Sequence, residues 1–251
     1  MNNNAIPKPK AKYMKNRVKY LIIFIVLVAI ALVAFLIAGK IKEGKYNPII
    51  DPLEFVTEVD NPHYTLTPGM SYIYQSETDE GTEKNIVVVT NETKNILGIT
   101  TTVVWDRVWF NDELIEETYD WYTQDKEGNV WYFGEDSKDY ENGVVVSTKG
   151  SWEAGIDGAE PGIVMEAHPK VGDSYRQEYY KGEAEDMGKV IALEESVTVP
   201  YRTFNDCIKT KDWSKIEPGK EYKYYCKGVG GVVLEIVPKS GGRVELMDVK
   251  S

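Results

Sequence analysis

One apolar segment of this chain is long enough to cross a lipid bilayer. Residues 21–38 read LIIFIVLVAIALVAFLIA and contain no charge, proline or glycine, and a helix of that length spans about 27 Å. A cleaved signal peptide has a shorter apolar core of about 7–15 residues, followed by a cleavage site of small residues. No cysteine for lipid attachment stands where the segment ends. The sequence therefore predicts a retained transmembrane helix over residues 21–39 in preference to a cleaved leader.

The charges on either side of this segment predict its orientation. Six basic residues and no acidic residue precede it, whereas three lysines and Glu43 follow it closely. Positively charged residues are retained on the cytoplasmic side during insertion. We therefore expect residues 1–20 to form a basic cytoplasmic tail and residues 21–39 to contact the lipid bilayer. The chain is then a single-pass protein of the cell membrane whose C-terminal part is extracytoplasmic.

The exported part of the chain is strongly acidic. Residues 1–45 hold nine Lys and Arg and one acidic residue, so totals of 29 basic and 40 acidic residues leave 20 and 39 after Lys45. A net charge near −19 repels nucleic acid, because proteins bind it by neutralising phosphates with Lys and Arg. We therefore expect no nucleic-acid partner.

The pattern after the apolar segment is typical of an all-β protein. Prolines among short apolar stretches predict a stalk or linker over residues 40–63, and a domain over residues 64–251. Short polar turns separate the expected strands, which favours an antiparallel meander folded as a sandwich or as a curved, partly closed sheet. Five glycines and two prolines in residues 150–172 predict a long ordered loop. The expected strands are 71–75, 85–90, 96–110, 113–124, 129–134, 143–148, 174–180, 190–199, 204–210, 221–226, 231–238 and 243–248.

The two cysteines, Cys207 and Cys226, lie in two expected strands that a polar connection joins. If the hairpin turns near residues 216 and 217, the two cysteines face each other, and an antiparallel pair of this kind can accept a disulfide. Disulfides persist outside the cytoplasm. We predict a Cys207–Cys226 disulfide, and the alternative is a pair of buried free thiols.

A dense polar and aromatic region over residues 116–135 supplies candidate binding residues. Indole rings offer stacking surfaces, so we consider Trp121, Trp131 and Trp152 as ligand-binding residues. Asp120, Asp125 and Asn129 carry the oxygen atoms that calcium prefers, but their spacing differs from that of an EF-hand loop, and turn formation alone explains Asp125 and Asn129.

Two further carboxylate arrangements have structural as well as functional interpretations. Glu116 and Asp120 lie on one face of an expected strand and could act as the carboxylate pair of a glycosidase, but surface charge and core packing explain them better. Asp106 lies in an expected central strand with apolar residues on both faces. We expect its carboxylate to be paired or hydrogen-bonded, because an isolated buried charge is costly.

Four segments of the sequence resemble a known group of proteins. They are YDWYTQDKEGNVWYFGE (119–135), GSWEAGIDGAEPGIVM (150–165), GDSYRQEYYKGEAED (172–186) and KYYCKGVGGVVLE (223–235). The group is a family of uncharacterised prokaryotic exported, lipoprotein-like, β-rich proteins. The resemblance implies a single exported domain and no catalytic assignment. The chain departs from it in its long anchor without a lipobox and in Cys226, where a small residue is expected, so the resemblance does not support the disulfide.

These observations give three hypotheses of function. The first is a membrane-anchored, non-enzymatic β domain that binds a small molecule, a glycan or a protein, or that supports the envelope. We expect the ligand to contact the concave face of the sheet and residues 150–172. The second is a calcium-stabilised surface module, and the third is an envelope hydrolase that acts on glycans.

Overall fold

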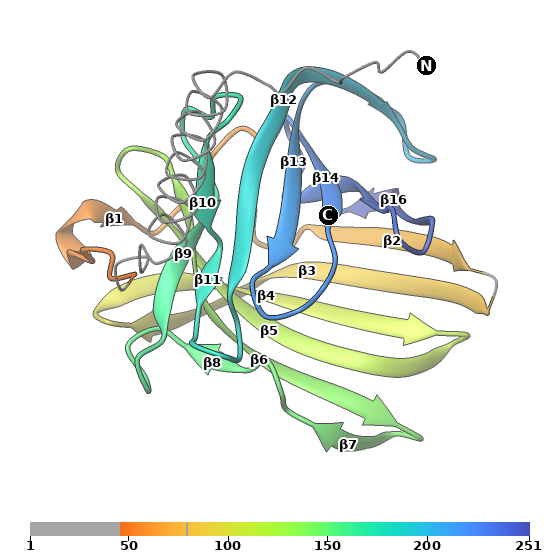
Figure 1. Ribbon diagram of the computed structural model, residues 1–251, viewed down its shortest axis with the longest axis horizontal. Coiled ribbons are helices and arrows are strands. Elements are labelled where there is room, and N and C mark those ends of the chain that lie inside the picture. Colours follow the sequence, from red (N-terminus) through yellow and green to blue (C-terminus); the bar gives the residue numbers. More distant parts are fainter. Residues whose placement is uncertain (1–45, 79) are drawn as a thin grey trace, which may run out of the picture. The chain divides into compact units, whose positions relative to one another are not determined.

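Antiparallel β-strands make up nearly all of the regular secondary structure in the part of the chain that the computed structural model describes, residues 46–78 and 80–251 (Figure 1). The predicted all-β antiparallel class is therefore confirmed. A 3₁₀ turn, η1 (Pro52–Glu54), precedes the strands. The strands are β1 (Phe55–Val56), β2 (Ser71–Thr78), β3 (Gly81–Ile96), β4 (Ile99–Phe110), β5 (Glu113–Asp125), β6 (Val130–Glu141), β7 (Val144–Ser147), β8 (Trp152–Glu153), β9 (Glu160–Met165), β10 (Ser174–Arg176), β11 (Glu178–Tyr179), β12 (Asp186–Thr198), β13 (Thr203–Ser214), β14 (Glu221–Cys226), β15 (Val232–Val237) and β16 (Gly242–Lys250).

Thirteen of the described strands form one continuous sheet in the order β10-β12-β13-β14-β15-β16-β2-β3-β4-β5-β6-β9-β11. Consecutive strands pair in most places, as a meander requires, because short turns join them. Strand β1 adds to β5, and β7 and β8 add to β6. Figure 1 shows β12 and β13 running steeply across the direction of β3 to β6, which a strongly twisted sheet produces as it wraps round.

The two ends of this sheet meet in one short segment of the chain. Strand β10 pairs with β12, and β11 pairs with β9, with only Gln177 between them. The Gln177 amide donates to the Asp186 carbonyl at 2.9 Å and so continues the pairing toward β12. The sheet is therefore nearly closed and barrel-like, and residues 174–179 form its seam.

The compact unit begins at Asn47, earlier than the stalk predicted over residues 40–63 allows. Phe55 in β1 packs edge-on against Trp131 and Phe133, with ring centroids 5.9 and 5.6 Å apart. Val59 is 1% exposed, and its carbonyl accepts a hydrogen bond from the Leu66 amide at 2.9 Å. The prolines of this segment prevent a regular helix, but they do not prevent isolated apolar side chains from entering the core.

Residues 150–172 also differ from the prediction, because this segment contains two strands in addition to loops. Both β8 and β9 pair with β6. The apolar side chains of Val164 and Met165 in β9 are buried. The glycines that suggested a loop have a different role here, since Gly162 allows the backbone at residues 176–177 to approach closely.

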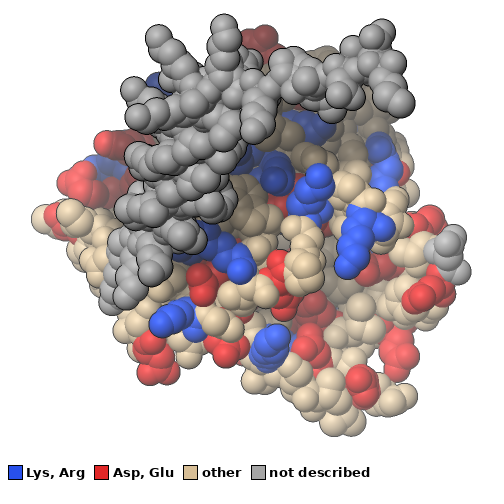
Figure 2. Space-filling model, viewed as in Figure 1, with Lys and Arg blue, Asp and Glu red and all other residues tan. Residues whose placement is uncertain are grey.

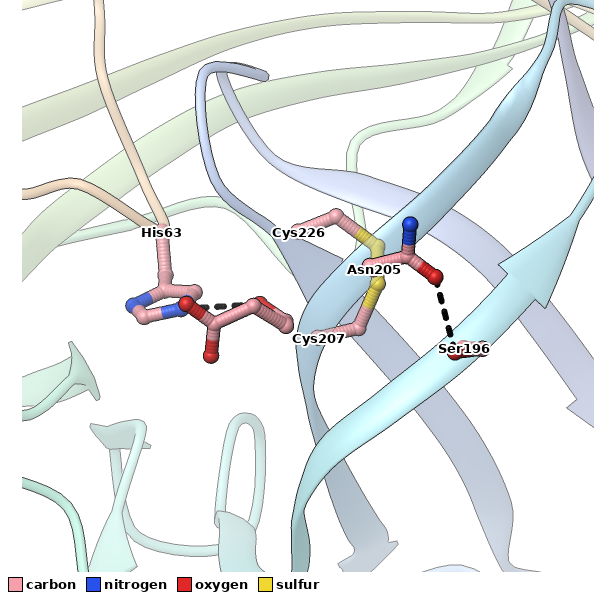
Figure 3. Close-up of a disulfide and its surroundings, with 6 residues drawn as sticks. His63, Ser196, Asn205, Cys207 and Cys226 are labelled. Carbon is pink, nitrogen blue, oxygen red and sulfur yellow. Dashed lines mark hydrogen bonds between the residues drawn. A yellow bond between two sulfur atoms is a disulfide. The ribbon is translucent and has the colours of Figure 1, made fainter.

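The predicted disulfide is confirmed. Cys207 in β13 and Cys226 in β14 are direct partners in the ladder, with their Cα atoms 4.1 Å apart (Figure 3). His63, from the N-terminal segment, contacts the Asp206 carbonyl at 3.2 Å beside it. Ser196 of β12 donates to Asn205 of β13 at 2.9 Å on the other side. A disulfide in this sheet indicates a domain located outside the cytoplasm.

The predicted cytoplasmic tail and transmembrane helix lie outside the described residues. Within residues 46–78 and 80–251, the structure has no helix that is both long and apolar enough to span a membrane.

Candidate functional site

A cavity of about 410 Å³ lies inside the barrel-like sheet. It is lined by carboxylic acids, tyrosines and branched apolar side chains. The acids are Asp106, Asp120, Glu135, Glu178, Asp186 and Glu235. The tyrosines are Tyr64, Tyr74, Tyr122, Tyr132 and Tyr225, and the apolar residues include Leu66, Val87, Val104, Val164, Val232 and Val244. This size and this mixture of polar and apolar groups are typical of small-molecule sites.

The alternation of side chains along two neighbouring strands places the first acids in the cavity. Val104 and Asp106 of β4 face inward, as do Asp120 and Tyr122 of β5. Successive side chains of a strand point to opposite faces, so residues two positions apart share the interior. Asp106 accepts a hydrogen bond from Asn85 of β3 at 2.6 Å. This confirms the hydrogen-bonded alternative expected for Asp106.

A β-bulge in β6 brings Glu135 into the same cavity. Asp120 of β5 pairs with Glu135 of β6, and Tyr122 of β5 pairs with Tyr132 of β6. Between these two pairs β5 advances by two residues and β6 by three, so β6 contains one extra residue. Gly134 within this bulge has a φ of 129°, a conformation that favours glycine. Tyr132 and Glu135 therefore both line the cavity although they are three residues apart. Bulges commonly re-aim a side chain in this way.

The carboxyl groups of β4, β5 and β6 form a diagonal row across the cavity wall. Asp120 and Glu135 are direct cross-strand partners, and Val104 is the partner of Asp120 on the other side. Directly opposite Cβ atoms in a sheet are about 4.5–5.5 Å apart, and diagonal neighbours such as Asp106 and Asp120 about 7–8 Å. Like charges placed directly opposite destabilise a sheet. The row therefore favours protonation of some members or the presence of a cation.

Burial keeps these carboxyl groups protonated at unusually high pH. Burial is the largest cause for each group, and negative neighbours add to it. Burial raises the pKa of Asp120 to about 7. The hydrogen bond from Tyr132 opposes this rise in pKa, and the negative charge of Glu116 adds to it. The pKa of Glu135 rises to about 9 through burial and the charge of Asp120. The pKa of Glu178 rises to about 8 through burial and the charge of Asp186.

Hydrogen bonds from aromatic side chains hold two of these acids in place. Tyr132 donates its hydroxyl to Asp120 Oδ1 at 2.7 Å, and its ring stacks on Tyr122 with centroids 4.8 Å apart. Trp152 of β8 donates its indole N–H to Glu178 Oε2 at 3.0 Å. The two acids thus have fixed orientations, which a selective site requires.

Lys223 of β14 is the only basic side chain among the described residues that line this cavity. Its Nζ lies 3.4 Å from Glu221, 3.8 Å from Asp212 and 3.8 Å from Glu235. Burial alone would lower the pKa of Lys223, but the charges of Glu235 and Asp212 hold it well above its ordinary value. Lys223 is therefore a cation that is already surrounded by its own carboxylates.

A second cavity, of about 480 Å³, adjoins the first. Three residues line both cavities, namely Glu178, Asp186 and Lys223. The second cavity is bounded by the connection between β13 and β14, residues 214–221. Lys223 therefore lies where the two spaces meet.

The three tryptophans predicted to bind a ligand lie around the cavity and are not among its lining residues. Trp152 is 5% exposed and contacts Tyr132 edge-on, so it supports two lining residues. Trp121 is covered by Lys94, whose Nζ lies 3.2 Å from the ring centroid. Trp131 donates its N–H to Asp125 at 2.8 Å. Their direct contact with a ligand stays a prediction.

The residues predicted to bind calcium have separate surroundings. Asp120 bonds to Tyr132 in the cavity, whereas Asp125 accepts hydrogen bonds from Asn129 and Trp131 in a turn. The Asn129 side-chain oxygen accepts from the Ala167 amide at 2.8 Å. Among the described residues, no three His, Cys, Asp or Glu side chains are grouped so that they could hold one metal ion. The calcium hypothesis stays a prediction.

Sequence reasoning identified Asp106 and Asp120 but missed Glu135, Glu178 and Lys223 as members of one site. In a regular strand Glu135 and Tyr132 would point to opposite faces of the sheet, and the bulge turns Glu135 to the same side as Tyr132. Glu178 and Lys223 come from distant strands that the closure of the sheet brings together. Glu178 and Lys223 lie within the expected strands 174–180 and 221–226, so a charged residue within a strand was the available signal for them, whereas Glu135 lies just beyond the expected strand 129–134.

Comparisons of the chain with family models, with curated proteins and with solved structures found no match.

Proposed function

We propose that this chain is a membrane-anchored, extracytoplasmic binding protein that holds a small ligand inside its barrel-like sheet and performs no chemistry on it. The observation that carries the proposal is the cavity of about 410 Å³, lined by oriented acids and tyrosines. An interior used only for stability would be filled with apolar side chains at crystal-like density. Several buried carboxyl groups instead reduce stability, so a binding role explains them better.

The location in this proposal follows from the apolar segment and from the disulfide. Residues 21–39 would anchor the chain, and the basic residues before them would stay in the cytoplasm. The Cys207–Cys226 bond supports an oxidising environment for the domain. The resemblance of four aromatic and glycine-rich segments to exported prokaryotic proteins belongs to the same proposal.

Hydrolysis of glycans is less well supported as the function of this site. The carboxylate pair suggested by the sequence is Glu116 and Asp120, but only Asp120 lines the cavity. Glu116 accepts a hydrogen bond from Thr118 at 3.1 Å. A glycosidase requires both carboxyl groups beside one glycosidic bond.

Native mass spectrometry of the full chain, purified from its own host in a non-ionic detergent, tests the proposal. We expect a small molecule that stays bound in the native state and is released on denaturation. Val104→Phe places a larger side chain in the cavity and should abolish this mass difference, whereas Val145→Phe on the exposed strand β7 should retain it. Near-ultraviolet circular dichroism confirms that both variants are folded. No releasable small molecule in the unmodified chain, or equal release from both variants, would overturn the proposal.

A further inference from the structure

We infer that the ligand of the interior cavity is a small organic cation that carries more than one protonated amino group, such as a diamine or polyamine. This inference rests on the proposed function, because it names the class of ligand that the same cavity takes. Four observations support it: the excess of acidic over basic groups in the cavity, its unfilled hydrogen-bond acceptors, the spacing of its acids and the chemistry of its remaining wall.

The cavity wall holds many more acidic than basic groups. Six carboxylic acids and one ammonium group line it. The ammonium of Lys223 is within ion-pair distance of only one of the six, Glu235, and otherwise pairs with Asp212 and Glu221. The ion pairs of Lys223 do not include the following four acids: Asp106, Asp120, Glu135 and Glu178.

The ratio of acids to bases is six to one in the cavity and about two to one in residues 46–251, which hold 39 acids and 20 bases. On the face of the domain shown in Figure 2, acidic and basic side chains are interspersed. Acids on such a surface are solvated and screened by salt, whereas acids in a cavity interact through a medium of lower dielectric constant. A cation in the cavity is therefore attracted to a neighbouring carboxylate more strongly than a cation on the surface is.

Two acceptors in the cavity wall have no donor. Asp120 is 9% exposed, and its Oδ1 accepts the hydrogen bond from the Tyr132 hydroxyl. Its Oδ2 receives no hydrogen bond from a described residue. The side-chain oxygen of Asn85 is fully buried and has no hydrogen-bond partner, while its nitrogen donates to Asp106. Buried acceptors without donors are costly. Both residues line the cavity, and Asp120 Oδ2 can accept a hydrogen bond there from an N–H group of a ligand.

The spacing of the acids favours an extended cation over a single ion. Asp106, Asp120 and Glu135 come from three adjacent strands, and the register places Asp106 on the diagonal from Asp120. In the part of the chain that the structure describes, no three His, Cys, Asp or Glu side chains are grouped so that they could hold one metal ion, and the Cα atoms of diagonal neighbours are about 7–8 Å apart. Two amino groups joined by a short methylene chain match such a separation.

The rest of the wall suits the methylene groups of such a ligand. Val87, Val104 and Val164 offer apolar surface between the acids. The rings of Tyr122 and Tyr132 are stacked beside Asp120, and aromatic faces attract ammonium groups. A cavity of about 410 Å³ has room for a chain of this kind together with water.

Isothermal titration calorimetry of the full chain in non-ionic detergent tests the inference with spermidine and putrescine as probes. We expect one molecule to bind per chain with release of protons, and Asp120→Asn and Glu135→Gln each to weaken binding by about tenfold or more, since each removes a carboxyl group that can ionise beside a bound ammonium. Glu127→Gln, on an exposed turn, is the matched control and should leave the affinity unchanged. Tetramethylammonium, which has charge but no N–H group, should bind more weakly than putrescine.

The outcomes separate this inference from the proposed function. Equal spermidine affinity in all variants would mean that the acidic surface binds the probe, and it would overturn the inference. The chain could instead bind calcium, glucose or glutamate saturably and bind no amine. If Val104→Phe abolishes that binding, the inference is overturned and the proposed function stays intact. Absence of amine binding together with absence of any releasable ligand in mass spectrometry would overturn both.

Discussion

Replacing Gly162 with alanine is expected to open the seam of the sheet and to lower the free energy of unfolding by about 3 kcal/mol, the upper part of the range for overpacked sites. A Cβ atom at this position would lie 2.4 Å from the Gln177 carbonyl carbon and 2.5 Å from the Arg176 carbonyl oxygen. These are backbone atoms, and they cannot rotate away as the end of a side chain can. Relief of the clash requires β9 and β11 to separate where Pro161 pairs with Glu178.

Chemical denaturation followed by tryptophan fluorescence measures this loss. Gly242→Ala is the matched control, because Gly242 also lies in a strand and a Cβ there meets two side chains and no backbone atom, the Ser240 hydroxyl at 3.0 Å and Val237 Cβ at 3.7 Å. The control should change the unfolding free energy by less than about 1 kcal/mol, as a small change at a permissive site does. If Gly162→Ala is as stable as Gly242→Ala, the seam does not close the sheet as described.

Stability is expected to fall as the pH rises from about 5 to 9 because of the buried carboxyl groups. The pKa values of Asp120, Glu135 and Glu178 in the folded state are about 7, 9 and 8. In the unfolded chain these groups titrate near pH 4, so the folded state binds more protons between pH 4 and 9 and is destabilised as they are removed. Each unit by which a pKa is raised corresponds to about 1.4 kcal/mol. We expect a total loss of at least about 3 kcal/mol from these groups.

Unfolding free energies measured at pH 5, 7 and 9 in the unmodified chain and in an Asp120→Asn, Glu135→Gln double variant check this expectation. Since the variant lacks two of the titrating groups, its stability should depend less on pH, and it should exceed the unmodified chain at pH 9. His63, whose pKa is lowered mainly by burial, contributes in the opposite direction in both proteins and cancels in the comparison. Parallel pH profiles for the two proteins would show that these carboxyl groups do not titrate as described.

Local patterns in the sequence predicted the elements that depend on local physics. Alternating apolar and aromatic residues between polar turns predicted the all-β class. The hairpin between Phe204 and Cys226 predicted the disulfide, because the turn position fixes which residues face each other. The turn at Leu97 and Gly98 was missed within the predicted strand 96–110, since apolar residues flank it on both sides.

The interior site depends on features that no local pattern carries. The extra residue in β6 reverses the alternation, so that Glu135 faces the cavity although a regular strand would turn it outward. The closure through Gln177 brings Glu178 to the same cavity as Glu135, Asp120 and Asp106, which lie 43 to 72 residues earlier in the chain. The strand β9 was hidden by Pro161 and Gly162, which ordinarily end a strand but here occupy a seam.

A crystal structure of the chain grown with spermidine tests most directly whether the interior acids form a binding site. The account predicts extended electron density in the cavity, with one nitrogen within hydrogen-bond distance of Asp120 Oδ2 and a second near Glu178 or Asp106. A cavity that contains only ordered water at a spermidine concentration that saturates the chain in calorimetry would contradict it.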